Sequence, residues 1–295
     1  MFDPPEYLTT KELADLLRTR ERKIYDLAAS GEIPCTRATG KLLFPKSSVM
    51  HWLQSNQVGL QSTMIDKPAP NVFLGSHDPL LFWALQASNC GIATIFDGSV
   101  AGLNSFVSGK GLASGMHIYE PATNSWNKNT VHEATMQQSV VLTKFCTRTR
   151  GILFSLEKHN RPKDIRDIQN LSFVQRQPLS GAQLLLDHHL NYHDIKSAHI
   201  NYTDLAHNET DAALGVVNGR ADIAIGLQCM AIQFQLGFVP IVHEEFDLLV
   251  DRQAWFESGF QTFWKFCQTK EFLNRAETMP GYDISSFGKI RYNSQ

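Results

Sequence analysis

Residues 209–226 read ETDAALGVVNGRADIAIG, and this stretch decides how the larger part of the chain folds. Its first half predicts a helix that ends at Gly219, because glycine stops the helical repeat of small apolar residues. Its second half is short and apolar, so it predicts a buried strand that carries Asp222 towards a turn at Gly226. A helix that leads directly into a buried strand is typical of a parallel sheet covered by helices.

The same alternation of strand and helix fills the chain upstream. Strands are predicted within 71–78, 91–99 and 111–121, and helices within 79–88 and 99–109. This order predicts an α/β unit with parallel strands and helices on the faces of the sheet. Such sheets bind ligands at the carboxyl ends of their strands, so the polar loops after these strands are candidate ligand sites.

Two long apolar runs predict that the larger unit has two lobes. The run at 140–154 is interpreted as a crossing into a second lobe, and the run at 238–251 as a crossing back. Between them, residues 171–190 predict a strand, a polar loop and a helix, and residues 255–279 predict closing helices. We expect a domain over 72–295 with helices flanking two sheets, with lobe I at about 72–142 and 246–295 and lobe II at about 143–245.

Residues 1–56 predict a small separate domain. A threonine cap followed by Glu12 predicts a helix over about 10–17, and the polar residues 18–20 predict a tight turn. A second helix follows and is expected to end at Gly31. The order of helix, tight turn and helix predicts a helix-turn-helix.

The rest of the small domain predicts a wing and a closing helix. Residues 33–45 contain two short extended runs around Gly40, which predict a hairpin. Ser47 or Ser48 is expected to cap a third helix over 49–54. Residues 57–71 lack periodicity and carry a Pro-Ala-Pro step, so they predict a linker.

Charge and cysteine content narrow the function classes. Residues 11–46 hold eight Lys or Arg against five Asp or Glu, a local charge of +3 in a chain of net charge −2, so basic residues gather in the small domain. The five cysteines are scattered and never in C-x-x-C spacing, which argues against a disulfide framework and a zinc site. No apolar run reaches about 18 residues and the N-terminus lacks a secretion signal, so we expect a soluble cytoplasmic protein.

The small domain resembles the winged helix-turn-helix of the excisionase and MerR-like DNA-binding domains. The resemblance is carried by YLTTKELADLL (7–17), RKIYDLAASGEIP (22–34), the glycine-containing wing and SSVMHWL (47–53). It implies that the second helix enters the major groove and that the wing contacts the DNA backbone. The alternative is that these residues are solvated surface charges. The residues expected at the DNA are Thr19, Arg20, Arg22, Lys23, Tyr25, Arg37 and Lys41.

The larger unit resembles the type II periplasmic-binding-protein fold, in the branch fused to helix-turn-helix domains and related to molybdate-type solute-binding proteins. The branch tends to have Arg-x-x-Gly-Ser-Gly-Thr-Arg where this chain has RQPLSGAQ at 176–183. The resemblance implies a one-component transcription regulator that closes over a small ligand, an oxyanion such as molybdate or tungstate. The stretches that carry the resemblance are 75–81, 96–121, 173–190, 209–226 and 238–250.

Three polar loops that precede predicted helices are candidates for an anion site. Helix N-termini present free N–H groups and about half a positive charge, and serine hydroxyls add donors. For each serine, plain N-capping is the alternative. We expect the loops to meet in one cleft around a tetrahedral oxyanion or a small carboxylate. The candidate ligand-binding residues are Ser76, His77, Ser99, His117, Arg176, Ser180, Gly181, Ala182 and Gln228.

Metal binding and catalysis are not expected. The histidines at 188, 189, 193, 199 and 207 form no compact ligand set on one helix face, and no nearby cysteine or carboxylate completes one. The sequence also contains no recognisable set of nucleophile, base and orienting group. We therefore predict neither a metal ligand nor a catalytic residue.

We interpret the chain as a ligand-responsive regulator that binds operator DNA as a homodimer or a higher even oligomer, with no membrane partner. The expected effector is a small anion, and an organic acid or sulfonate is the alternative to an oxyanion. Two alternatives belong to other classes: an enzyme on a binding-protein-like fold, and an architectural DNA binder that ignores metabolites. The sequence leaves the operator, the effector and the sign of regulation open.

Overall fold

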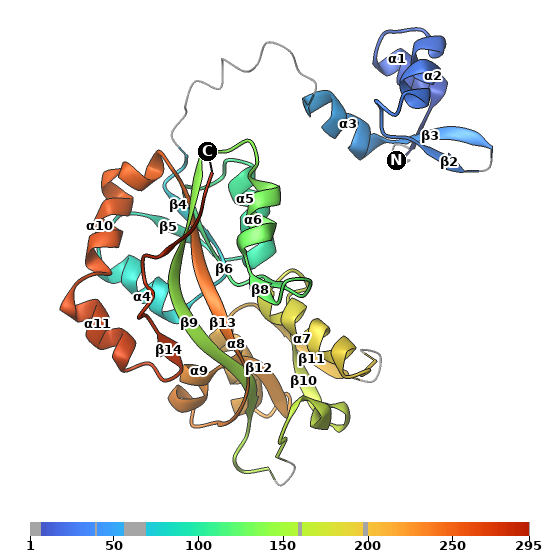
Figure 1. Ribbon diagram of the computed structural model, residues 1–295. Helices are drawn as coiled ribbons and strands as arrows, with labels where there is room; N and C mark the ends of the chain where they lie inside the picture. Colours follow the sequence, from blue (N-terminus) through green and yellow to red (C-terminus); the bar gives the residue numbers. More distant parts are fainter. Residues whose placement is uncertain (1–6, 39, 56–68, 159–160, 197–199, 295) are drawn as a thin grey trace. The chain divides into compact units, whose positions relative to one another are not determined.

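The computed structural model describes residues 7–38, 40–55, 69–158, 161–196 and 200–294. The chain divides into two compact units, unit 1 at Met1–Lys67 and unit 2 at Pro68–Gln295 (Figure 1). Most of the predicted linker, Thr39 of the predicted hairpin and His199 of the histidine-rich region lie outside the described residues.

Unit 1 is a helix-turn-helix with a small antiparallel sheet. Strand β1 (Tyr7–Thr9) leads into helix α1 (Thr10–Leu16), and a turn joins this helix to helix α2 (Glu21–Ala29). Strands β2 (Thr36–Ala38) and β3 (Lys41–Pro45) form the wing. Strand β3 lies in the middle of the sheet and pairs antiparallel with both β1 and β2.

Local sequence explains most of these boundaries. Thr9 caps α1 and forms a capping box with Glu12, as the sequence analysis expects. Helix α3 (Lys46–Ser55) begins before Ser47, so the predicted serine cap is wrong. The helix starts directly after Pro45, the last residue of β3. Strand β1 is not predicted, because three residues are too few to show an alternating pattern and their pairing with β3 is what makes them a strand.

The core of unit 1 combines side chains from all three helices and the sheet. Leu13, Ile24, Phe44 and Val49 are fully buried, and they come from α1, α2, β3 and α3 respectively. Burial of each such side chain contributes roughly 1.5–3 kcal/mol to folding. This packing holds α2 by one face and leaves its opposite face exposed.

Unit 2 is built around two long strands that run through both lobes. Strands β9 (Val140–Phe154) and β13 (Gly237–Asp251) are each 15 residues long and pair antiparallel over nearly their whole length. Figure 1 shows them side by side along the length of unit 2. They lie where the sequence analysis places the two crossings between the lobes.

Lobe I adds three parallel strands to this central pair. Strand β6 (Ala113–Met116) pairs with β13, β4 (Val72–Gly75) pairs with β6, and β5 (Ala93–Ile95) forms the edge. Helices α4 (Pro79–Ala87) and α5 (Ser99–Val107) connect these strands. The carboxyl ends of β4 and β6 therefore lie next to each other.

Lobe II repeats the arrangement on the other side of the central pair. Strand β12 (Ile223–Leu227) pairs with β9, followed by β10 (Ser172–Arg176) and β11 (Asn201–Ala206), and these three strands are parallel. Helices α7 (Gly181–Tyr192) and α8 (Glu209–Val217) connect them. Because β9 and β13 belong to both lobes, the two groups of strands are joined in one ten-stranded sheet.

The C-terminal segment packs on lobe I and then returns to the central strands of unit 2. A 3-10 turn η3 (Ala254–Phe256) precedes helices α10 (Ser258–Phe266) and α11 (Lys270–Glu277), in agreement with the predicted closing helices. Strands β14 (Tyr282–Asp283) and β15 (Ile290–Asn293) then pair with β9. The sequence analysis does not predict this tail, which brings Tyr282 to the centre of the sheet.

Smaller elements complete unit 2. A short hairpin of β7 (Tyr119–Glu120) and β8 (Ser125–Trp126) follows β6. Helix α6 (Lys128–Ala134) lies before β9, and helix α9 (Gln228–Gln233) follows β12 directly. After β9 the chain forms the 3-10 helix η1 (Ile165–Asn170).

Aromatic side chains fix the closing helices to the central strands. Phe145 on β9 packs edge-on against Phe246 on β13 and Phe272 on α11, with ring centroids 6.2 and 5.9 Å apart. All three rings are fully buried. Edge-to-face pairs of this kind add about 0.5–1.5 kcal/mol to the stabilisation from burial. The central strands are therefore firmly packed beside the polar groups described next.

Candidate functional site

Polar residues at the carboxyl ends of β4 and β6 meet at one point in lobe I. The Ser76 hydroxyl, just after β4, lies 3.1 Å from Nε2 of His117, just after β6. The backbone N–H of His117 donates to the hydroxyl of Ser99 at the start of α5, also at 3.1 Å. All three residues are buried. The structure thus brings together three of the predicted ligand-binding residues.

The start of α7 in lobe II lies directly against this group. A Cβ atom on Gly181 would lie 2.5 Å from the backbone oxygen of His117, and a Cβ on Gly98 would lie 3.3 Å from Cα of Ser180. The N–H of Val100 donates to the carbonyl of Leu179 at 3.4 Å. The lobes therefore meet backbone to backbone, and glycine at position 181 is required for the contact.

The three predicted serines differ in their role as helix caps. Ser180 is the N-cap of α7, because its hydroxyl accepts from the N–H of Gln183. Helix α4 is capped by Asp78 instead, so Ser76 is not its cap, and Ser99 follows the N-cap residue Gly98. Plain capping therefore accounts for Ser180 but not for Ser76 or Ser99.

A chain of buried ion pairs runs from lobe I into the central strands. Arg148 on β9 donates to Asp78 at 2.8 Å and to Glu244 on β13 at 2.5 Å. The Nε atom of Arg150 donates to Glu244 at 2.8 Å, and Nδ1 of His117 lies 3.0 Å from the same carboxylate. All of these side chains are at most 1% exposed. Leaving any one of these charges unpaired would cost several kcal/mol.

The chain of ion pairs continues into lobe II through Glu209, the first residue of α8. Its carboxylate accepts from both terminal nitrogens of Arg150, at 3.1 and 3.3 Å, and from Arg176 at the end of β10, at 3.1 Å. Glu209 and Arg176 are 1% and 5% exposed. Charged groups from both lobes and from the strands between them therefore form one buried network.

Burial and the neighbouring charges set the protonation states in this network. Burial lowers the pKa of His117 to about 4, so its imidazole is neutral at pH 7. Burial raises the pKa of the Glu244 carboxyl, but Arg148 and Arg150 outweigh this effect and hold the pKa well below its usual range. Asp78, Glu209 and Glu244 then balance Arg148, Arg150 and Arg176, and the network carries no net formal charge.

Two buried guanidinium groups in this network keep a donor without a partner. The Nε atoms of Arg148 and Arg176 make no hydrogen bond in the part of the chain that the structure describes, and neither does Nδ1 of the half-buried His77. Buried donors of this kind usually find a partner, so they mark places where an acceptor would bind favourably.

The remaining predicted ligand-binding residues have other neighbours. The His77 ring packs against Phe82 and Phe96, with centroids 5.5 and 5.7 Å away. Ala182 packs in the apolar core of lobe II. Gln228, the first residue of α9, lies against Gly281, where a Cβ would come within 2.8 Å of its side-chain oxygen.

Most of the ion pairs were missed by the sequence analysis. Asp78, Arg148, Arg150, Glu209 and Glu244 are not predicted as site residues. A signal was present: the two arginines stand two apart in an apolar run predicted to cross between lobes. Side chains two apart on a strand face the same side, and buried charges need partners.

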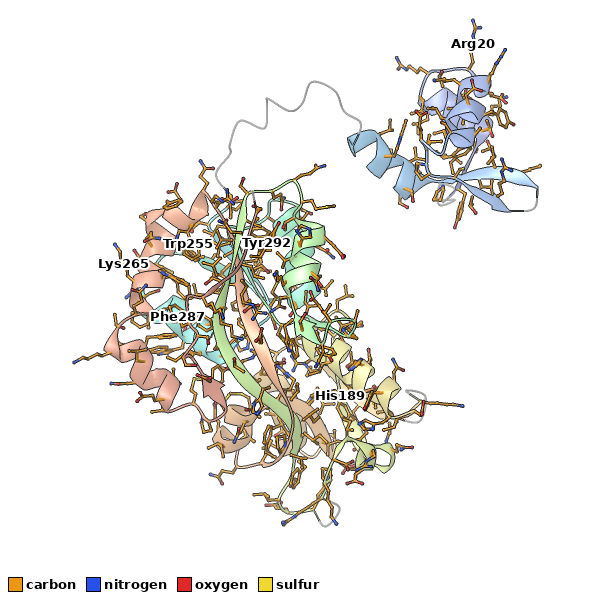
Figure 2. The ribbon with its side chains drawn as sticks, viewed as in Figure 1. Arg20, His189, Trp255, Lys265, Phe287 and Tyr292 are labelled. Carbon is orange, nitrogen blue, oxygen red and sulfur yellow. The ribbon has the colours of Figure 1, made fainter. Side chains whose placement is uncertain are left out.

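The predicted DNA-binding residues line two exposed hollows of unit 1. Thr19, Arg20, Arg22 and Lys23 border a hollow of about 570 Å³ at the start of α2. Arg20 precedes α2 and points away from the rest of unit 1 (Figure 2). The other three predicted residues, Tyr25, Arg37 and Lys41, border a second hollow of about 680 Å³ beside the wing.

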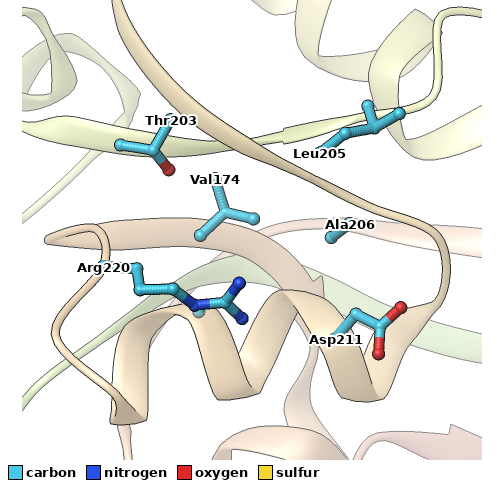
Figure 3. Close-up of a pocket in the computed structure, with 7 residues that line it drawn as sticks. Val174, Thr203, Leu205, Ala206, Asp211 and Arg220 are labelled. Atoms are coloured by element: carbon cyan, nitrogen blue, oxygen red, sulfur yellow. The ribbon is translucent and has the colours of Figure 1, made fainter.

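A separate small cavity of about 170 Å³ lies at the outer edge of lobe II. Figure 3 shows it between β11, which carries Thr203 and Leu205, and helix α8. None of the predicted ligand-binding residues is among the residues that line it.

Two further classes of site, metal centres and membrane-spanning helices, are absent from the described ranges of the chain. These ranges contain no group of three or more His, Cys, Asp or Glu side chains that could hold a metal ion. Among the same residues, no helix has both the length and the apolar character needed to cross a membrane.

Comparison with known families identifies both units. Residues 83–268 match the family described as a PBP superfamily domain, where PBP denotes periplasmic binding protein. The chain belongs to this superfamily. Residues 7–57 match a helix-turn-helix domain family. The family resemblance and the fold class predicted from the sequence are confirmed.

Individual relatives extend over different parts of the chain. The uncharacterised protein YvgK of Bacillus subtilis strain 168 is 22% identical over 302 residues, covering 96% of each chain. An uncharacterised Clostridium pasteurianum protein from the 5′ region of a 2Fe-2S ferredoxin gene is 28% identical over 109 residues, 36% of this chain and 96% of that protein.

A solved structure shares the fold of unit 2. It is a candidate phosphate ABC transporter substrate-binding protein from Clostridium perfringens with bound phosphate, with a TM-score of 0.52 and 14% identity over 70% of this chain and 96% of that chain. The two family matches give the chain the organisation of a DNA-binding regulator with a ligand-binding domain.

Replacing Gly181 by alanine should separate the lobes. The added Cβ has no room against the His117 backbone oxygen, so we expect a loss of about 1–3 kcal/mol in stability. We also expect faster amide hydrogen exchange at Val100, which donates across the contact. Ser286→Ala is the control, since this serine is exposed and the change adds no atom. Unchanged exchange at Val100 in Gly181→Ala would contradict this account.

His117→Gln should weaken the dependence of stability on acid pH. The folded pKa of His117, about 4, lies below its ordinary value of 6.5, so the unfolded state takes up the proton first as the pH falls. Stability is then lost between about pH 6.5 and 4, by up to about 3 kcal/mol. Urea unfolding across this range measures the loss, with the exposed His132→Gln as control. An equal loss in His117→Gln and the unmodified chain would refute the assignment.

Proposed function

We propose that the chain is a ligand-responsive DNA-binding transcription regulator whose unit 2 binds a small anion between its lobes. The observation that carries this proposal is the meeting of Ser76, Ser99 and His117 from lobe I with the start of α7 from lobe II. Helix N-termini and hydroxyl groups from opposite lobes can then contact one small guest.

The proposed effector is a compact oxyanion, with molybdate and tungstate as first candidates. The N-termini of α5 and α7 each supply free N–H groups and about half a positive charge. Arg148 and Arg176 each add a buried Nε donor that has no partner among the described residues. The resemblance to molybdate-type binding proteins supports this choice, and the same fold holds phosphate in the Clostridium perfringens protein.

An organic acid is the second candidate effector. Arg150 holds the Glu209 carboxylate through both of its terminal nitrogens, a planar geometry that suits a free carboxylate equally well. A small carboxylic acid or sulfonate could use the same guanidinium group.

Regulation follows if the anion binds the closed lobes better than the open ones. A ligand changes DNA affinity only when it favours one of two arrangements, so the closed contact at Gly98 and Gly181 is the arrangement it would select. A dimer on a two-fold operator is part of the proposal, because helix-turn-helix proteins commonly read two half-sites with two copies.

A panel of anions tests the effector. Molybdate or tungstate at a hundredfold excess over its Kd should raise the thermal midpoint of the full-length chain by roughly 5–10 °C. The Ser76→Ala and Ser99→Ala double variant should lose most of this shift, whereas Ser286→Ala at an exposed serine should keep it. A shift with small carboxylates alone would select the second candidate. No shift with any anion at millimolar concentration would reject the proposed site.

Arg22→Ala tests the DNA interface. If this side chain reads a base, the variant should lose roughly 5- to 150-fold in affinity for an operator selected in vitro, and much less for random DNA. Fluorescence anisotropy measures both affinities, and Lys46→Ala at the start of α3 is the matched control. Equal losses on the two DNAs would make Arg22 a phosphate contact.

A further inference from the structure

The three carboxylates of the buried network differ in how firmly the fold needs them. Asp78 caps α4 and also accepts from the Tyr282 hydroxyl at 2.6 Å. Glu244 holds Arg148, Arg150 and His117 at once. Both carboxylates therefore support the packing of several elements, independently of any ligand.

Glu209 has no such second task in the described structure. Its carboxylate accepts only from Arg150 and Arg176. It is not needed as a helix cap either, because Asn208 caps α8 by accepting from the N–H of Asp211 at 2.8 Å. Of the three carboxylates, this one can move without disturbing a helix end or the central strands.

The contacts of Glu209 are also the longer ones in the network. Its three hydrogen bonds measure 3.1–3.3 Å, whereas the Nε atom of Arg150 lies 2.8 Å from Glu244. Charge-assisted bonds are strongest at about 2.7–2.9 Å, so Glu209 is the more weakly held partner of Arg150. The geometry is that of an anion bound by two guanidinium groups.

The net charge of the network would change if the Glu209 carboxylate turned away from the arginines. With the carboxylate in place, the three arginines and three carboxylates balance. With Glu209 turned away, the network carries +1, and the N-termini of α5 and α7 add about +0.5 each. The resulting charge of about +2 matches a divalent oxyanion, whose burial beside Glu209 would leave uncompensated negative charge.

We propose that Glu209 is an internal competitor for the effector: its carboxylate occupies the place at Arg150 and Arg176 that an oxyanion takes when the carboxylate turns away. This inference rests on the proposed function, since it names the anchor of the anion within the same cleft. It makes α8 the element that responds first to the effector, because its first residue is the one displaced.

Glu209→Gln in the full-length chain tests the inference. A competitor that holds the site nine-tenths of the time or more lowers the apparent affinity at least about tenfold, so the variant should bind molybdate at least about tenfold more tightly than the unmodified chain. Isothermal titration calorimetry measures the Kd. Acetate, a monovalent probe, should gain less. A role of Glu209 in folding alone would not produce tighter binding.

Glu244→Gln is the matched control. Glu244 is as buried as Glu209 and shares Arg150 with it, but it also holds Arg148 and His117. Its loss should weaken molybdate binding or leave it unchanged. Glu209→Asp keeps the charge but shortens the side chain, so it should fold and bind with an intermediate affinity, which keeps the test decisive if Glu209→Gln is unstable.

The outcomes separate this inference from the proposed function. Molybdate binding by the unmodified chain with equal or weaker binding by Glu209→Gln would overturn the competitor role and leave the anion sensor standing. Binding by Glu209→Gln alone would support the competitor and reject molybdate as the effector of the unmodified chain. A larger gain for acetate than for molybdate would overturn the divalent oxyanion. Absence of binding in every variant would overturn both proposals.

Discussion

The burial of three arginines and three carboxylates where the lobes meet is the constraint on which unit 2 depends. Each charge taken from water alone costs several kcal/mol, so all six must be placed together and with good geometry. Strands β9 and β13 meet this need because they carry Arg148, Arg150 and Glu244 on adjacent positions of one ladder. The N-termini of helices from both lobes must then lie at fixed positions around these charged groups.

The contact between the lobes has a different physical character from the charge network. It is made by backbone atoms, with Gly181 allowing an approach that leaves no room for a Cβ atom and Gly98 one in which a Cβ would be tightly packed. A gap of about 0.5–1 Å at such a contact already removes roughly a quarter to a half of its van der Waals attraction, so the closed contact is favoured only when the fit is tight. A cleft closed in this way can take two discrete states, which a regulator needs to convert binding into a change at DNA.

Local patterns in the sequence predicted much of the fold. Alternation of strand and helix, the two long apolar crossings and the capping box at Thr9 and Glu12 are local signals, and the structure has each of them. Elements without a local signal were missed. Strands β1, β14 and β15 are only two to four residues long, and they exist because β3 or β9 offers them an edge to pair with. The predicted serine cap of α3 failed because the helix already begins at Lys46.

The sequence by itself determined the two units, most of their element types and the serine loops after β4 and before α7, since these follow from spacing, glycine positions and polar steps between apolar runs. Only the tertiary structure decided that Ser76, Ser99 and His117 share hydrogen bonds, and that Asp78 and Glu209, 131 positions apart, belong to one network. The physical reason is that the energy of a charge depends on its neighbours in space and on its distance from water. The periodicity of residues along the chain gives neither the spatial neighbours of a charge nor its distance from water.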